Sequence, residues 1–167
     1  MELSLFLDKF LSISGASSVT ELNDKLLNIV LNNDIKKYES YCELVNNDLS
    51  EDLLQKVYQY YQADRNGLKQ DYTPKTLAKL VAKLSQNDEI IDMCCGSGAL
   101  TIQKWNIEPD TKFTLYELDE NVIPYLLFNL AVRNIKARVY RKDVLSQEIF
   151  DTYDVIPQER FSRVIKK

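Results

Sequence analysis

The chain has 167 residues, a mass of 19.4 kDa and a net charge of −4, with 45% hydrophobic and 28% charged residues. This composition is typical of a globular protein with one catalytic domain at most, and no apolar run approaches the roughly 20 residues that span a bilayer. The complete lack of histidine excludes a histidine-based catalytic triad, histidine zinc sites and imidazole acid–base chemistry.

The cysteines and the charge distribution indicate where the protein would be found and which part of it would bind a polyanion. The chain has an odd number of cysteines, and two of the three are adjacent: Cys42, Cys94 and Cys95. This pattern is a poor framework for disulfides. Glu2 stands where a secretory signal carries positive charge, so we expect a cytoplasmic protein without a membrane segment. Residues 1–66 hold 11 acids and 6 bases, whereas residues 67–167 hold 14 acids and 15 bases. A polyanionic partner would therefore meet the second part of the chain.

Residues 1–66 predict an amino-terminal helical region. Apolar residues recur at helical spacing from Leu3 to Leu11, from Leu22 to Val30 and from Leu53 to Tyr61. Ser18 with Glu21 matches a capping box at a helix start, and Asp48 with Glu51 repeats the pattern with an acid as the cap. We expect these helices to pack on a neighbouring element and not to carry catalysis.

Residues 67–167 predict an α/β domain. Thr73 and Pro74 indicate a helix start, with Leu77, Leu80, Val81 and Leu84 on its inward face. The strands expected after it are 89–94, 112–118, 137–142 and 153–156, with helices at 99–105 and 122–134. Such alternation favours an α/β fold with an incomplete parallel sheet of about four strands covered by helices.

A glycine loop follows the first predicted strand. Asp92-Met93-Cys94-Cys95-Gly96-Ser97-Gly98 lies between that strand and a helix, where open α/β sheets bind ligands. Glu117 ends the next strand, and an acid there can accept the hydroxyl hydrogens of a ribose. Thr101 stands where a dinucleotide fingerprint needs its third glycine, and no Gly-Lys-Ser/Thr follows. Asp92 would repel a pyrophosphate but could receive an ammonium group, so S-adenosylmethionine is the better ligand.

These residues carry a family resemblance. The segment from Asp92 to Gly98 resembles the D-x-x-C-G-S-G loop of S-adenosylmethionine-dependent DNA adenine N6-methyltransferases, and is most similar to modification subunits of type I restriction-modification systems. Tyr72-Thr73-Pro74 resembles the family's [FY]-T-P segment. The resemblance covers about residues 67–156 and implies a Rossmann-like class I methyltransferase core in a domain that spans 67–167.

The resemblance also implies a role for each matching residue. Tyr72, Thr73 and Pro74 would lie near the methionine end of the cofactor, as would the loop residues Asp92, Cys95, Gly96, Ser97 and Gly98. Glu117 matches the ribose-binding acid, and Leu118 the apolar residue beside the adenine. Asp143 matches the acid that accepts from the adenine amino group, with Val144 next to it. No metal ligand is implied.

Several of these residues have an alternative interpretation as structural residues without a role in binding. Asp92 could simply cap the loop, and Asp143 could be a turn acid. Cys94 and Cys95 are expected to be small buried residues and not nucleophiles. The basic group from Arg133 to Lys142 is more often a solvated surface than a DNA contact.

The family's catalytic motif, [DN]-P-P-[FYW], is absent. The prolines are Pro74, Pro109, Pro124 and Pro157, so no two are adjacent, and residues 157–167 could form a short basic helix. We therefore expect a truncated domain that binds the cofactor and is inactive alone, either a fragment of a longer methyltransferase or a shortened relative. DNA would be reached through a longer chain or a partner subunit.

Two alternative functions fit the same sequence features, and the sheet predicts a protein partner. A methyltransferase of another acceptor (RNA, protein or a small molecule) would keep the same cofactor half. A non-enzymatic decoy that binds a restriction-modification subunit would need no methyl transfer. A sheet cut at its fourth strand would leave an open edge, so we expect a protein partner or self-association to cover it.

Overall fold

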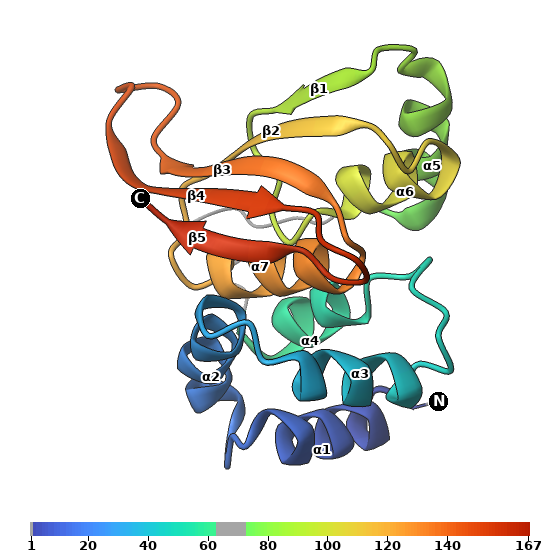
Figure 1. The fold of residues 1–167 in the computed structure, drawn as a ribbon, viewed down its shortest axis with the longest axis vertical. Coiled ribbons are helices and arrows are strands. Elements are labelled where there is room, and N and C mark those ends of the chain that lie inside the picture. Colours follow the sequence, from blue (N-terminus) through green and yellow to red (C-terminus); the bar gives the residue numbers. More distant parts are fainter. Residues whose placement is uncertain (1, 63–72) are drawn as a thin grey trace.

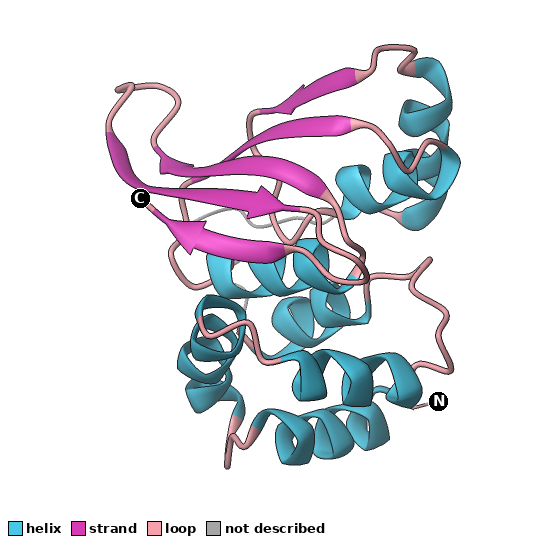
Figure 2. Cartoon of the chain, viewed as in Figure 1, coloured by secondary structure: helices cyan, strands magenta, loops and turns pink. Residues whose placement is uncertain are grey.

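The computed structural model describes residues 2–62 and 73–167. The four helices of the first segment are α1 (Leu3–Ser14), α2 (Val19–Leu31), α3 (Ile35–Leu44) and α4 (Leu53–Tyr61). The second segment holds α5 (Lys75–Leu84), β1 (Glu89–Asp92), α6 (Ala99–Ile107), β2 (Lys112–Glu117), α7 (Ile123–Val132), β3 (Lys136–Lys142), β4 (Ile149–Ile156) and β5 (Arg163–Lys166). The predicted amino-terminal helices and the later α/β alternation are both present (Figure 2).

The strands form one sheet in the order β1-β2-β3-β4-β5. β1, β2 and β3 are parallel, whereas β4 runs antiparallel to β3 and β5 antiparallel to β4. The carboxyl ends of β1 and β2 therefore lie at the same edge of the sheet, and this brings the glycine loop and Glu117 into one region. The α/β fold is confirmed, and its sheet is mixed and has five strands.

The prediction of a parallel fourth strand was wrong. Residues 143–148 are the whole connection between β3 and β4, and a parallel crossover needs about a dozen residues or more. The Asp143 amide donates to the Glu148 carbonyl at 3.0 Å and closes a hairpin instead. Residues 157–167 do not form the predicted basic helix, because β5 pairs with β4 and buries Val164. The open sheet edges are thus β1 and β5, and the partner expected to cover an edge stays a prediction.

Helix α7 is the centre of the hydrophobic core. It lies between the sheet and the helical layer of α1 to α4 (Figure 1), and all ten of its residues are buried. The Phe128 ring lies 5.6 Å from the Phe10 ring and 5.1 Å from the Tyr41 ring, both in edge-to-face geometry. One continuous core therefore joins the amino-terminal helices to the sheet. The predicted boundary at residues 66 and 67 lies outside the described residues.

Helix α5 reverses the face that its sequence predicts. Leu77, Leu80, Val81 and Leu84, expected to face inward, are 49%, 54%, 37% and 72% exposed. The helix instead packs on α6, with Ala78 and Ala82 as its buried residues. Small side chains let two helices approach closely. The alanine face of α5 therefore packs against α6, and the larger apolar face is exposed.

Two predicted helix caps also differ. The Ser18 side chain makes no capping bond, and Glu21 accepts from the amide and hydroxyl of Ser17, each at 2.9 Å. Asp48 accepts from the Ser50 amide, and the cap of α4 is Asp52. The capping acid is thus one turn later in the sequence than predicted.

Among residues 2–62 and 73–167, no helix combines the length and the apolar composition that crossing a membrane requires.

Ion pairs on β4 predict a loss of stability in acid. The pairs join Asp151 to Arg141 and Lys166, and Asp154 to Arg138 and Lys167, at 2.7 to 3.0 Å. Hydrogen bonds from Lys166 and from Arg138 hold the pKa values of Asp151 and Asp154 below their usual range. A lowered folded-state pKa contributes stability above the unfolded value, about 3.9, that is lost as pH falls through the folded value. We expect the urea midpoint to fall on acidification below about pH 5, and less steeply when both acids are changed to asparagine.

The control for this prediction is Asp8→Asn, which changes an exposed acid of α1. This variant should follow the wild-type curve. Equal acid sensitivity of the wild type and the Asp151→Asn/Asp154→Asn variant would contradict the role of the β4 pairs.

Candidate cofactor site

The glycine loop turns sharply between β1 and α6. Gly96 and Gly98 have φ values of +56° and +99°, in the left-handed region where a side chain is strained. A Cβ at Gly98 would lie 3.1 Å from Leu126 Cδ1 of α7. Gly98 is buried and packs against α7, and the close approach of a ligand to the loop stays a prediction.

The loop is bound to the end of β2. The Cys95 amide donates to the Tyr116 carbonyl at 3.1 Å, and the Gly96 amide donates to Glu117 Oε2 at 2.8 Å. The structure thus brings together the loop and the distant acid that the sequence paired. Their direct hydrogen bond was not predicted.

The Glu117 carboxylate already accepts hydrogen bonds from three backbone amides. Oε1 accepts from the Leu118 and Asp119 amides, both at 2.9 Å, in addition to the Gly96 bond at Oε2. Burial is the main cause that raises the pKa of Glu117, and the three amides act against it. A carboxylate has about four acceptor positions, so one position on Oε2 is left for a ligand hydroxyl. The sequence-based expectation had this acid accept both ribose hydroxyls.

Asp92 ends β1 and has one unpaired oxygen. Oδ1 accepts from the Cys94 amide at 3.2 Å, while Oδ2 is buried without a hydrogen-bond partner among the described residues. Burial raises the pKa of Asp92. A buried carboxylate oxygen of this kind gains most from a charged donor such as an ammonium group. This acceptor oxygen therefore fits the amino group of S-adenosylmethionine.

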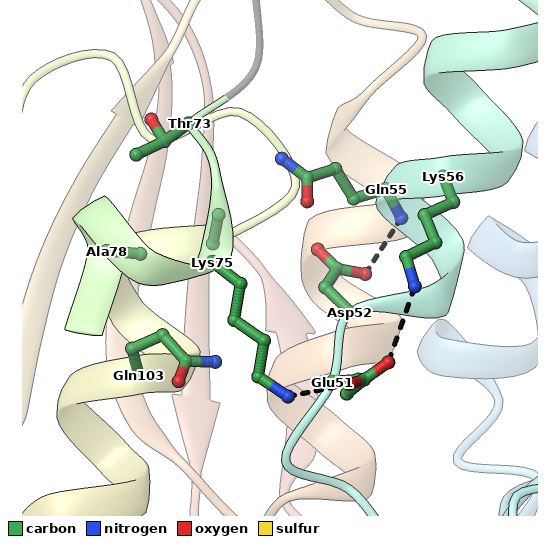
Figure 3. A pocket seen from close by; sticks show the side chains of 9 residues that line it. Glu51, Asp52, Gln55, Lys56, Thr73, Lys75, Ala78 and Gln103 are labelled. Carbon is green, nitrogen blue, oxygen red and sulfur yellow. Dashed lines mark hydrogen bonds and ion pairs between the residues drawn. The ribbon is translucent and has the colours of Figure 1, made fainter.

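A small pocket lies beside the loop. It is formed where α4, α5 and α6 begin, with a cavity volume of about 80 Å³, and Thr73 is on its wall (Figure 3). Its lining is Glu51, Asp52, Gln55, Lys56, Thr73, Lys75, Ala78, Ala99 and Gln103. Lys75 reaches across it to Glu51 at 2.7 Å. Pro74 caps α5, one residue later than the predicted start, and Tyr72 lies outside the described residues.

Asp143 and Val144 begin the hairpin between β3 and β4. Asp143 Oδ1 accepts from the Leu145 and Ser146 amides at 2.8 and 3.3 Å, and these bonds lower the pKa of Asp143. Glu117 is paired in register with Arg141, so Asp143 lies two residues further along the chain, directly after the end of β3. The structure therefore shows Asp143 as a turn acid, and its contact with an adenine stays a prediction. Leu118, expected beside the adenine, is 49% exposed.

Cys95 and Ser97 are turned into the protein. Cys95 is 6% exposed and Ser97 is 1% exposed, so both belong to the packing of the loop. Cys94, also expected to be buried, is exposed instead. Burial raises the pKa of the Cys95 thiol well above its usual value, which matches a packing residue and not a nucleophile. The Ser97 hydroxyl donates to Asp52 Oδ2 at 2.8 Å.

Sequence reasoning missed the partners of Ser97. Asp52, Asn129 and Arg133 are 8%, 0% and 3% exposed and form a buried polar network behind the loop. Arg133 had been placed in a solvated basic group. An acid before a helix and an asparagine within an apolar helix were the only signals in the sequence.

Strands β1 to β3 form the parallel part of an α/β sheet, with a glycine loop after β1 and a hydrogen-bonded acid at the end of β2, which is the edge where open α/β sheets bind ligands. The family model for the methyltransferase small domain matches residues 68–158. The chain belongs to this family of S-adenosylmethionine-dependent methyltransferases. No curated protein matches the chain, and no solved structure does.

Proposed function

We propose that this chain is the S-adenosylmethionine-binding part of a DNA adenine N6-methyltransferase of the restriction-modification type and is inactive alone. The observation that supports it most is the bond between the Gly96 amide and Glu117, because the proposal needs a ribose acceptor directly beside the glycine loop. Asp92 Oδ2, which has no hydrogen-bond partner among residues 2–62 and 73–167, adds an acceptor for the cofactor's amino group.

Each of these residues then has a definite task. Asp92 accepts from the ammonium group, and Glu117 accepts one ribose hydroxyl at its remaining position. Leu118 offers an exposed apolar side chain to the adenine ring, and Asp143 an acceptor to its amino group. When bound, the cofactor supplies a methyl group on a sulfonium, which an acceptor nitrogen can attack.

The DNA adenine acceptor rests on the loop sequence and its neighbouring motifs. Thr73-Pro74, the segment from Asp92 to Gly98, Glu117 and Asp143 follow the order of that family. Transfer to an adenine needs a flipped base held by acceptors and a stacking ring. No adjacent prolines occur in this chain to supply the family's motif for that task, so methyl transfer requires residues from a longer chain or a partner subunit.

A methyltransferase of another acceptor is the second candidate. The match to the methyltransferase small domain supports it equally, because that match extends to the methyltransferase class and to no particular acceptor. The cofactor half would be the same, and the acceptor would be an RNA, a protein or a small molecule.

A calorimetric titration with S-adenosylmethionine tests the proposal. We expect a dissociation constant near the micromolar range, about −8 kcal/mol. Absence of binding by the folded chain would overturn the cofactor assignment. A second arm incubates the chain with tritiated cofactor and unmethylated DNA, RNA or a protein mixture. No arm should incorporate label; label in DNA would contradict inactivity, and label only in RNA or protein would favour the second candidate.

A further inference from the structure

The amino-terminal helical region contributes a buried acid to the glycine loop. Asp52 caps α4, where its Oδ1 accepts from the Gln55 amide at 2.8 Å (Figure 3). A capping acid normally lies at the surface, but this one is 8% exposed. Its second oxygen therefore needs a donor from another part of the chain, and that donor is the Ser97 hydroxyl.

Asn129 of α7 completes the contact. Its side-chain amide donates to Asp52 Oδ1 at 2.9 Å and to the Ser97 carbonyl at 3.0 Å. Ser97 is thus held through both its hydroxyl and its carbonyl. Since the preceding amide, that of Gly96, is bound to Glu117, the loop is anchored on one side by β2 and on the other by the helical region.

Arg133 stabilises the contact between Asp52, Asn129 and Ser97. It donates to the carbonyls of Leu49 and Glu51 and to the Asn129 side chain, each at 2.9 Å. These bonds fix the segment that carries Asp52 against α7. They also place a cation near the buried carboxylate, which offsets part of its desolvation.

We propose that Asp52 is a positioning residue of the cofactor site, acting through Ser97 to hold the glycine loop in its binding conformation. This inference rests on the proposed function. A loop with two glycines at positive φ has many conformations when it is not anchored, and a ligand that must order it binds less tightly. The helical region is then part of the site and not a separate packing module.

The test compares Asp52→Ala and Ser97→Ala with Asp34→Ala. Asp34 is a matched control because it caps α3 in the same way, through a bond from the Lys37 amide, and does not contact the loop. All variants are titrated with S-adenosylmethionine at a temperature where circular dichroism shows each to be folded. Hydrogen exchange of the amides of residues 95–98 is measured on the same samples without cofactor.

We expect Asp52→Ala and Ser97→Ala each to weaken binding about tenfold, and the double variant to be no weaker than the worse single one, because both remove the same bond. Asp34→Ala should bind within about twofold of the wild type. Exchange at residues 95–98 should be faster in Asp52→Ala and unchanged in Asp34→Ala.

Two results would overturn the inference. One is a folded Asp52→Ala variant that is less stable but binds as the wild type does, which is the behaviour of a purely structural cap. The other is loop exchange that Asp52→Ala leaves unchanged. If the wild type itself does not bind S-adenosylmethionine, the proposed function fails, and the exchange comparison still decides whether Asp52 positions the loop.

Discussion

Changing Glu117 to alanine should weaken S-adenosylmethionine binding by at least about 100-fold. The change removes the ribose acceptor, and a hydrogen bond to a charged group contributes about 1.5–3 kcal/mol. It also frees the Gly96 amide, so the loop keeps only the bond from the Cys95 amide to the Tyr116 carbonyl as its attachment to β2. The measurement is the same calorimetric titration, made on protein whose folding is checked by thermal unfolding.

Glu120→Ala is the control for this prediction. Glu120 follows three residues later, is exposed and pairs only loosely with Arg141 at 3.3 Å. Its loss should leave the affinity unchanged. Glu117→Gln should bind less tightly than the wild type, because an amide group replaces one of two oxygens that both accept from backbone amides. A Glu117→Ala variant with wild-type affinity would remove Glu117 from the site.

The raised pKa of Glu117 adds a pH dependence. Because burial makes this acid easier to protonate in the folded chain, it loses its charge at a pH above the ordinary value of about 4.3. The charged form is the acceptor of hydroxyl hydrogens. Affinity for the cofactor should therefore fall on acidification while the fold is still intact, and this fall should be smaller in Glu117→Gln, where Asp92, whose pKa burial also raises, is the site acid that still titrates.

Local patterns in the sequence were sufficient to predict most elements. Apolar spacing placed α2 and α4, and the change from apolar strand to glycines to helix placed β1 and α6. Register then explains why Glu117 lies beside the loop, since β1 and β2 are parallel neighbours. This part of the candidate site follows from short-range rules.

The side on which an apolar face is buried could not be predicted in the same way. Leu80 and Leu84 give α5 a clear apolar face, yet periodicity says only that such a face exists. The contact with α6 is made by Ala78 and Ala82, whose small size matters only once both helices are in place. The direction of β4 depended on loop length, and locating its start at Tyr153 instead of Ile149 concealed how short the connection is.

The network behind the loop depends on contacts that are distant in sequence. Asp52 meets Ser97 and Asn129 across 45 and 77 positions, and no local pattern relates these residues. Arg133 was predicted to be solvated because it belongs to a run of bases near a helix end. In the structure Arg133 is buried instead, and the carbonyls of residues 49 and 51, in the segment before α4, accept its hydrogens.

Replacing Arg133 by methionine should lower the free energy of unfolding by about 3–5 kcal/mol. Methionine keeps much of the side-chain volume but leaves the Asp52 carboxylate buried without its nearby cation. It also leaves the carbonyls of Leu49 and Glu51 without a donor in a buried region. The measurement is urea unfolding followed by circular dichroism at neutral pH, with the wild type and the variant at the same protein concentration.

Arg138→Met is the matched control, since Arg138 is an exposed arginine of β3 with one ion pair to Asp154. Its urea midpoint should move far less than that of Arg133→Met. Adding Asp52→Asn to Arg133→Met should recover part of the lost stability, because the neutral amide no longer needs a cation in the interior. Additive losses in the double variant would show that Arg133 stabilises the fold through the carbonyls of residues 49 and 51 alone, and the electrostatic coupling to Asp52 would be withdrawn.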